Sequence, residues 1–135
     1  MPGGNLGANF LRPNQTHDGT DPFFFTYSFM IQGRMIAPQQ DTPANRITYG
    51  ACITTNQNLT VGMSANATGV YSSLFGYKKS CFSNAISMPN YLMAAVVGNL
   101  VQTPVVDFGG VTSYIWAEPG VIGAAANEFS NLQSM

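Results

Sequence analysis

Few side chains in this sequence could carry out chemistry, and they are widely separated. His17 is the only histidine, and it lies in a loop rich in Gly, Asp and Thr, where we expect a solvated imidazole. Together with Cys52 and Cys81 it makes a poor zinc ligand set, because zinc sites use closely spaced ligand pairs. Neither cysteine has a base beside it in the sequence, so a nucleophilic thiol would require His17 to fold onto it.

The carboxylates offer one further possibility, a pair for general acid–base catalysis. Glu118 and Glu128 are ten residues apart, one after an expected strand and one on an expected helix. Acid–base catalysis needs both groups at one substrate, and this spacing does not bring them together, so Glu128 is expected on the solvated side of its helix. No serine lies in a nucleophile elbow, and the glycine clusters lack the pattern of a phosphate-binding loop. The residues by themselves therefore indicate no active site.

The composition indicates one folded domain. The chain has 135 residues, of which 45% are hydrophobic and only 8% are charged, and its formal net charge is −1. A disordered chain has the opposite balance, with few apolar residues and a high net charge. The scattered basic residues argue against a nucleic-acid-binding surface. The first ten residues lack the basic and apolar regions of a secretory signal, so we expect a cytoplasmic protein. Cys52 and Cys81 could form one disulfide, but such a location favours reduced thiols.

Alternation of apolar and polar residues predicts a series of β-strands. The segment "RITYGACITT" alternates most regularly, and "PFFFTYSFMI" alternates more loosely. Further strands are expected in "LTVGM", which is followed by a turn, around 80–88 and over 113–116. The residues expected to share a face are Ile47, Tyr49, Ala51 and Ile53 in the first segment, and Phe25, Tyr27, Phe29 and Ile31 in the second.

The stretch "PNYLMAAVVGNLVQTP", residues 89–104, lies in a run without charge between Lys79 and Asp107. A membrane-spanning helix needs about 20 mainly apolar residues. The apolar part here is only Tyr91–Val97, so no membrane span is expected. A short run that contains paired valines favours a strand buried on both faces, and a buried helix of the same length is the alternative.

The C-terminal region changes period. Apolar residues recur there at helical spacing, and Pro119 fits near a first helical turn. The recurring residues are Val121, Ala125, Phe129 and Leu132. We therefore predict an all-β, mainly antiparallel or mixed fold that ends in the start of an α-helix.

Eight short phrases follow one another along the chain in an order typical of a known family. They are "FLRPNQT", "DPFFF", "PQQDTP", "ITYGACI", "GMSAN", "PNYLMAAVVGNL", "IWAEP" and "AANEFSNLQSM". Over about residues 8–135 they resemble the N-terminal domain of the leukotriene A-4 hydrolase and aminopeptidase B family, which are gluzincin zinc aminopeptidases. The resemblance implies a saddle-like β-sheet domain packed against a zinc-bearing catalytic domain. Residues 1–21 would be an irregular segment, 22–118 part of the β domain, and 119–135 a linker and first helix leading toward the catalytic domain.

The family's catalytic motifs are absent from this sequence. The resemblance implies zinc held by HExxH and a distant Glu, and a Gly-x-Met-Glu-Asn loop that grips the substrate's amino end; neither motif occurs here. We therefore expect no zinc and no activity from these residues alone. The expected role is a non-catalytic domain portion that supports the catalytic domain and forms one wall of the substrate cleft. The alternative is a stand-alone β-module with a binding or structural role and no peptidase activity, for which a homo-oligomer is the expected form.

One family site falls within the chain. The family's Gln-x-Gln at the substrate entrance corresponds to Tyr27 and Phe29, so aromatic side chains replace both amides. A ring lacks the amide oxygen that accepts a hydrogen bond from a substrate ammonium, although Tyr27 keeps a hydroxyl. We therefore expect Tyr27 and Phe29 to pack the sheet rather than to grip a peptide. The family's following His corresponds to Gln32.

Overall fold

Most of the chain folds into β-structure, as its alternating pattern predicts. The computed structural model describes residues 7–72 and 74–131. The strands are β1 (Ala8–Leu11), β2 (Phe23–Thr26), β3 (Arg46–Asn56), β4 (Thr60–Met63), β5 (Asn66–Ser72), β6 (Tyr77–Pro89), β7 (Ala95–Gly98), β8 (Val101–Phe108) and β9 (Val111–Ala117). The helical segments are short 3-10 turns at Pro13–Gln15, Gly33–Met35, Leu74–Gly76 and Asn90–Leu92, and the helix α1 (Ile122–Glu128). The predicted mainly β fold, ending in the start of a helix, is confirmed.

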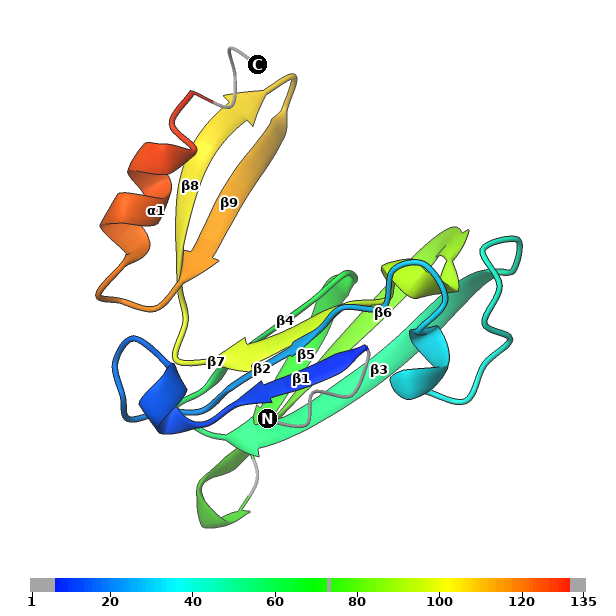
Figure 1. The fold of residues 1–135 in the computed structure, drawn as a ribbon, viewed down its shortest axis with the longest axis horizontal. Helices are drawn as coiled ribbons and strands as arrows, with labels where there is room; N and C mark the ends of the chain where they lie inside the picture. The colour runs from blue at the N-terminus through cyan, green and yellow to red at the C-terminus, as the bar shows by residue number, and fades with distance from the viewer. Residues whose placement is uncertain (1–6, 73, 132–135) are drawn as a thin grey trace.

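The described strands form three sheets (Figure 1). The strand order is β1-β2-β7-β4 in one sheet and β3-β6-β5 in the second, and β8 pairs with β9 as a hairpin. Every strand pair in these residues is antiparallel. Strand β7 joins the two halves of the first sheet, because Val96 lies opposite Phe25 of β2 on one side and Gly62 of β4 on the other.

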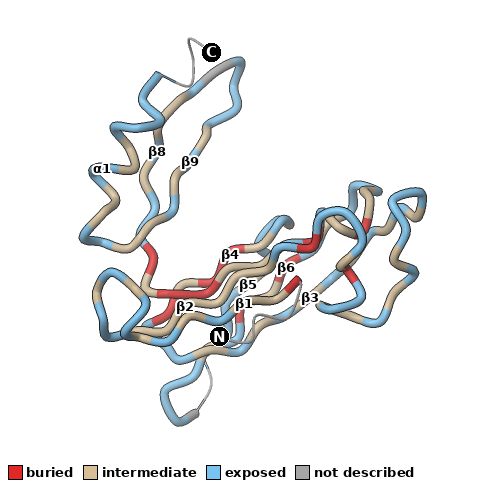
Figure 2. Tube along the Cα trace, in the orientation of Figure 1, coloured by how far each residue is buried: buried red, intermediate tan, exposed pale blue. Residues whose placement is uncertain are grey.

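A small apolar core holds the two larger sheets together. Its buried members are Leu59, Val61, Phe82 and Val97, each 8% exposed, and Phe24, Ile53, Met63 and Ala65 pack against them. Figure 2 shows buried segments along β4, β6 and β7, the strands that contribute Val61, Phe82 and Val97, and Leu59 directly precedes β4. Full burial of one such side chain stabilises a fold by about 1.5–3 kcal/mol, so these few residues matter strongly to the whole domain.

Strand β3 lies where the most regular alternation of apolar and polar residues predicts a strand. Exposure alternates at every residue from Arg46 to Asn56, with the predicted apolar face turned inward. Ile53 on that face packs against the core. The period-2 pattern therefore identified both the strand and its buried side.

Two strands lie where the sequence predicts turns or irregular chain. Strand β1 lies inside segment 1–21, and β5 occupies residues predicted to form a turn after β4. Both are edge strands, and β5 is mostly exposed and rich in residues that favour turns. Pairing with a neighbour orders them: Phe10 lies opposite Phe24, and Ala67 lies opposite Phe82.

The uncharged stretch 89–104 is only partly the strand predicted for it. Strand β7 contains the predicted valines, but Asn90–Leu92 forms a 3-10 turn closed by the Met93 N–H, which donates to the Asn90 carbonyl over 3.1 Å. The Asn90 side chain is fully buried, and its amide donates to the Gln40 carbonyl. This buried polar anchor interrupts the extended chain. Within the described residues, none of the helices reaches the length and hydrophobicity that crossing a bilayer requires.

The β8–β9 hairpin and α1 form an arm that projects from the two larger sheets (Figure 1). Gly109 and Gly110 make the hairpin turn with φ of 60° and 80°, a conformation that glycine adopts without strain. The helix packs against both strands of the hairpin. Its position confirms the helical spacing predicted from Val121 to Phe129, whereas Leu132 lies outside the described residues.

Candidate functional site

Tyr27 and Phe29 lie on a loop that follows β2. Their side chains are 65% and 57% exposed, so the expectation that they pack the sheet is wrong. Strand β2 ends at Thr26 because the chain turns away there: the buried Ser28 hydroxyl donates to the Tyr91 carbonyl over 2.8 Å. The Tyr27 N–H donates to the Gly7 carbonyl over 2.8 Å. Backbone and Ser28 contacts thus hold the loop while both aromatic side chains face solvent.

The exposed side chains of this loop form an apolar surface. Besides Tyr27 and Phe29, Met30 and Ile31 are about half exposed. The Phe29 ring meets the Tyr91 ring edge to face, with 5.5 Å between centroids. We call these four loop residues with Tyr91 the aromatic loop surface. Adjacent exposed apolar groups are typical of a binding or docking surface, and here the hydroxyls of Tyr27 and Tyr91 and the backbone are the groups that offer hydrogen bonds.

The segment that follows braces this loop. The Asp41 carboxylate accepts a hydrogen bond from the Gly33 N–H at 3.0 Å and lies 3.6 Å from the Arg34 guanidinium. The Asp41 side chain is only 4% exposed. Because a nearly buried carboxylate needs such partners, Asp41 of the phrase "PQQDTP" holds the turn that directly follows the aromatic loop surface.

Glu118 has a structural role in place of the acid–base role considered for it. Its two carboxylate oxygens accept hydrogen bonds from the backbone N–H groups of His17 and Asp18, at 3.0 and 3.2 Å. The His17 imidazole lies against Gly120, since a Cβ there would be 2.6 Å from its Nε2. Glu128 is exposed at the end of α1. Glu118 thus ties the N-terminal loop to the end of the hairpin arm.

Asp18 forms a second set of hydrogen bonds between the N-terminal loop and the base of the arm. Its carboxylate accepts hydrogen bonds from the Thr20 N–H at 2.9 Å, the Asp21 N–H at 3.2 Å and the Asn99 amide at 2.9 Å. Donation by the Thr20 N–H, and then by the Asn99 amide, holds the pKa of the Asp18 carboxyl well below its ordinary value. Asn99 lies between β7 and β8, so this bond fixes the base of the arm.

The lowered pKa of Asp18 predicts a specific acid sensitivity. Ionised Asp18 stabilises the fold above its ordinary pKa of about 4, and this stabilisation is lost as the pH falls below that value. Asp18→Asn should therefore lower the melting temperature at pH 7 and flatten its decline between about pH 5 and pH 2. Asp107→Asn, at an exposed carboxylate of β8, is the matched control and should keep the wild-type decline. Identical profiles for both variants would show that the Asp18 contacts contribute nothing.

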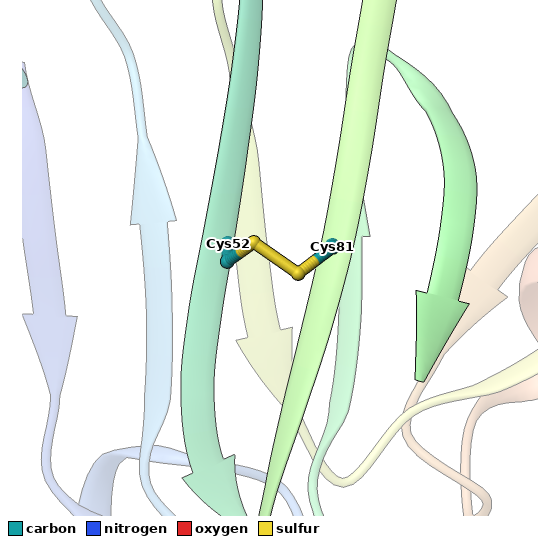
Figure 3. The surroundings of a disulfide bond; sticks show 2 residues. All are labelled: Cys52 and Cys81. Atoms are coloured by element: carbon teal, nitrogen blue, oxygen red, sulfur yellow. A yellow bond between two sulfur atoms is a disulfide. The ribbon is translucent and has the colours of Figure 1, made fainter. Parts of the chain in front are cut away.

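Cys52 and Cys81 are bonded to each other, which corrects the expectation of reduced thiols. They lie directly opposite each other in the β3–β6 ladder, with 4.1 Å between their Cα atoms (Figure 3). In a strand pair, opposite residues point to the same face. The expectation rested on cellular compartment and took no account of register, which places these two thiols side by side.

The described residues do not fit a zinc ion. No three His, Cys, Asp or Glu side chains in 7–72 and 74–131 come together in a way that could hold a metal. Both cysteines are consumed by the disulfide, and His17 faces Gly120. Zinc needs three or four converging ligands, so the donor set required by the family's chemistry is not assembled from these residues.

An apolar groove of about 630 Å³ lies between β4, β5 and the base of the arm. Trp116 and Val96 line it, and none of its lining residues is charged. Its floor requires Gly62, where a Cβ would lie 3.0 Å from Val96 and 3.4 Å from the Trp116 ring. The groove therefore presents mainly dispersion contacts and offers no charged partner to a substrate.

Comparisons with known proteins identify relatives across nearly the whole chain, although no family model matches it. Mouse aminopeptidase B is 34% identical over 126 residues and human aminopeptidase B 33% identical, in each case over 93% of this chain. Among solved structures, yeast LTA4 hydrolase in complex with bestatin superimposes with a TM-score of 0.74 and 25% identity over 93% of this chain. An M1 zinc metallopeptidase mutant from Deinococcus radiodurans shares the fold, with a TM-score of 0.58 and 21% identity over 70% of this chain. The chain spans about 18% of the length of the aminopeptidase B and LTA4 hydrolase chains.

Proposed function

Because this chain belongs to the leukotriene A-4 hydrolase and aminopeptidase B family and corresponds to part of its N-terminal β domain, we propose that it supports a zinc-bearing catalytic domain and forms one wall of a substrate cleft. The observation that carries the proposal is the agreement of sequence and fold over 93% of the chain. The relatives are about five times longer, which leaves ample chain for a catalytic domain. The proposed location is the cytoplasm, and segment 119–135 would lead into the catalytic domain.

The aromatic loop surface supports a position at the cleft. Tyr27 and Phe29, the residues that correspond to the family's entrance glutamines, are exposed and held on a braced loop. A surface of this kind can contact a bound peptide without moving, so it loses little conformational entropy on binding. Replacement of two amides by rings favours apolar substrate side chains over a hydrogen-bonded amino terminus.

The catalytic chemistry is proposed to reside outside these residues. The described donor set does not fit zinc, and Glu118 and His17 are engaged in holding the arm. This chain would therefore contribute shape, apolar contact and support. Its unpaired edge strands, such as β5, offer further surface for the rest of the enzyme or for a second copy.

The intact mass and metal content of the native product test this role. We expect a mass several-fold above 14.4 kDa, with bound zinc and aminopeptidase activity on an uncharged aminoacyl substrate. A native product of about 14 kDa without zinc would instead support the stand-alone β-module, and sedimentation would then show whether it self-associates.

Restoring the family's amides provides a residue-level test in the active product. Tyr27→Gln combined with Phe29→Gln should lower KM for a peptide with a free amino terminus by about three- to tenfold for each hydrogen bond that is regained, since one such bond contributes about 0.5–1.5 kcal/mol. An N-acetylated peptide lacks the ammonium and should show no gain. Tyr71→Gln, at a 58% exposed tyrosine of β5, is the matched control. An unchanged KM for the free peptide would show that Tyr27 and Phe29 do not lie at the substrate entrance.

A further inference from the structure

The Cys52–Cys81 disulfide lies on the outer face of the β3-β6-β5 sheet. Side chains of neighbouring residues in a strand point to opposite faces, and Phe82 and Ile53, the neighbours of the two cysteines, face the core. Cys52 is exposed, whereas Cys81 is half-buried. Strand β3 is also an edge strand, so within the described residues β6 is the only strand that pairs with it.

The residues around the bond leave one sulfur open. Gly50 precedes Cys52 by two residues on the same face, and a Cβ there would meet only the Phe82 carbonyl oxygen at 3.8 Å. On the other side Gly69 lies opposite Cys81, and Tyr71 lies over Gly69, with its hydroxyl 2.9 Å and its nearest ring carbon 3.1 Å from where a Cβ would be. Cys81 thus has a tyrosine beside its strand partner, and Cys52 is the more exposed residue of the pair.

A lysine lies on the same face as the more shielded sulfur. Lys79 precedes Cys81 by two residues and lies opposite Tyr71 and Thr54, so its Cα is about 7 Å from that of Cys81. Lys78 points to the opposite face of β6. A nearby ammonium stabilises a thiolate, so Cys81 is the better leaving group of the two.

We propose that Cys52–Cys81 is a thiol–disulfide exchange site, opened by a dithiol that attacks Cys52 Sγ first. The attacking thiolate forms a bond to Cys52 Sγ, the Cys52–Cys81 bond breaks, and Cys81 leaves as a thiolate that takes up a proton. The second thiol of the dithiol then displaces Cys52. The protein gains two electrons and two protons, and the dithiol becomes a disulfide. A monothiol such as glutathione forms the same mixed disulfide on Cys52, which acid quenching traps before the Cys81 thiolate or a second glutathione displaces it.

The fold is expected to persist when the bond opens. Strand β3 remains paired with β6 from Tyr49 opposite Asn84 to Asn56 opposite Tyr77. The core contacts of Ile53 and Phe82 lie on the other face. Exchange therefore changes the outer surface of the sheet and leaves its pairing in place.

Thiol trapping on the protein purified without reductant tests the site. Treatment with glutathione, followed by acid quenching, alkylation and peptide mass spectrometry, should place the adduct on Cys52 in excess over Cys81, on the order of tenfold. Dithiothreitol should release both thiols with the far-ultraviolet circular dichroism of the folded protein retained. Adducts mainly on Cys81, thiols released only in urea, or two free thiols before any treatment would each overturn the proposal.

The paired lysines supply matched variants. Lys79→Gln should slow opening by dithiothreitol about two- to threefold, as expected for one charge about 7 Å away in water, and added salt should remove the difference. Lys78→Gln carries the same charge change on the opposite face and should react at the wild-type rate. Equal slowing in both variants would mean that net charge, and not the position of Lys79, sets the rate.

Discussion

Loss of the Cys52–Cys81 bond is expected to lower the free energy of unfolding by about 3–4 kcal/mol. The bond closes a loop between residues 29 apart in sequence, and this constraint reduces the conformational entropy of the unfolded chain. Urea unfolding with and without a phosphine reductant measures the difference. The variant that combines Cys52→Ala with Cys81→Ala should unfold at the same urea concentration as the wild-type protein with its disulfide reduced, and the reductant should not change that concentration. An unchanged midpoint on reduction of the wild-type protein would contradict the expected stabilisation.

Phe82→Ala is expected to cost about 3–5 kcal/mol of folding free energy. Phe82 is 8% exposed and packs in the core with Val61 and Val97, so the substitution removes apolar contact and leaves a cavity between the two sheets. Chemical denaturation monitored by circular dichroism gives the cost. Ile86→Ala, on the same strand at a 75% exposed side chain, should change stability by no more than about 0.5 kcal/mol. Similar losses for both variants would mean that the core is not where the structure places it.

The parts of the fold that follow from local period could be predicted from the sequence. Strand β3 alternates over its whole length and buries the predicted face. Helix α1 lies where apolar residues recur at helical spacing. In β3 the residues that set the pattern also face the core, so local and tertiary preferences agree. In the helical region Val121 and Ala125 are half-buried, whereas Phe129 is exposed.

The parts that depend on distant contacts could not be predicted. Strand β2 ends because Ser28 bonds to the carbonyl of Tyr91, 63 residues away, and nothing in "PFFFTYSFMI" marks that end. Strand β5 is ordered by its pairing with β6 despite a turn-like composition.

For the candidate site, too, the sequence predicts which residues are involved but not the features that depend on distant contacts. The resemblance to the family predicts an entrance position for Tyr27 and Phe29, but it does not show whether their side chains are exposed, because the alternation there suits a strand. The cysteine pairing likewise depended on the register of two strands 29 residues apart. The register between β3 and β6 is set by the turns and strands that connect them. The composition of the chain gives no information about that register.

The ties made by Asp18 and Glu118 also bear on how the chain folds as it is synthesised. Glu118 bonds to the N–H of His17, 101 residues earlier, and Asn99 bonds to Asp18, 81 residues earlier. At translation rates of roughly 5–20 residues per second, Glu118 is added about 5–20 s after His17. Strand β6 can pair with β3 well before that. Contacts between distant residues close the longest loops and form late, so the N-terminal loop must remain undocked until the arm has been made.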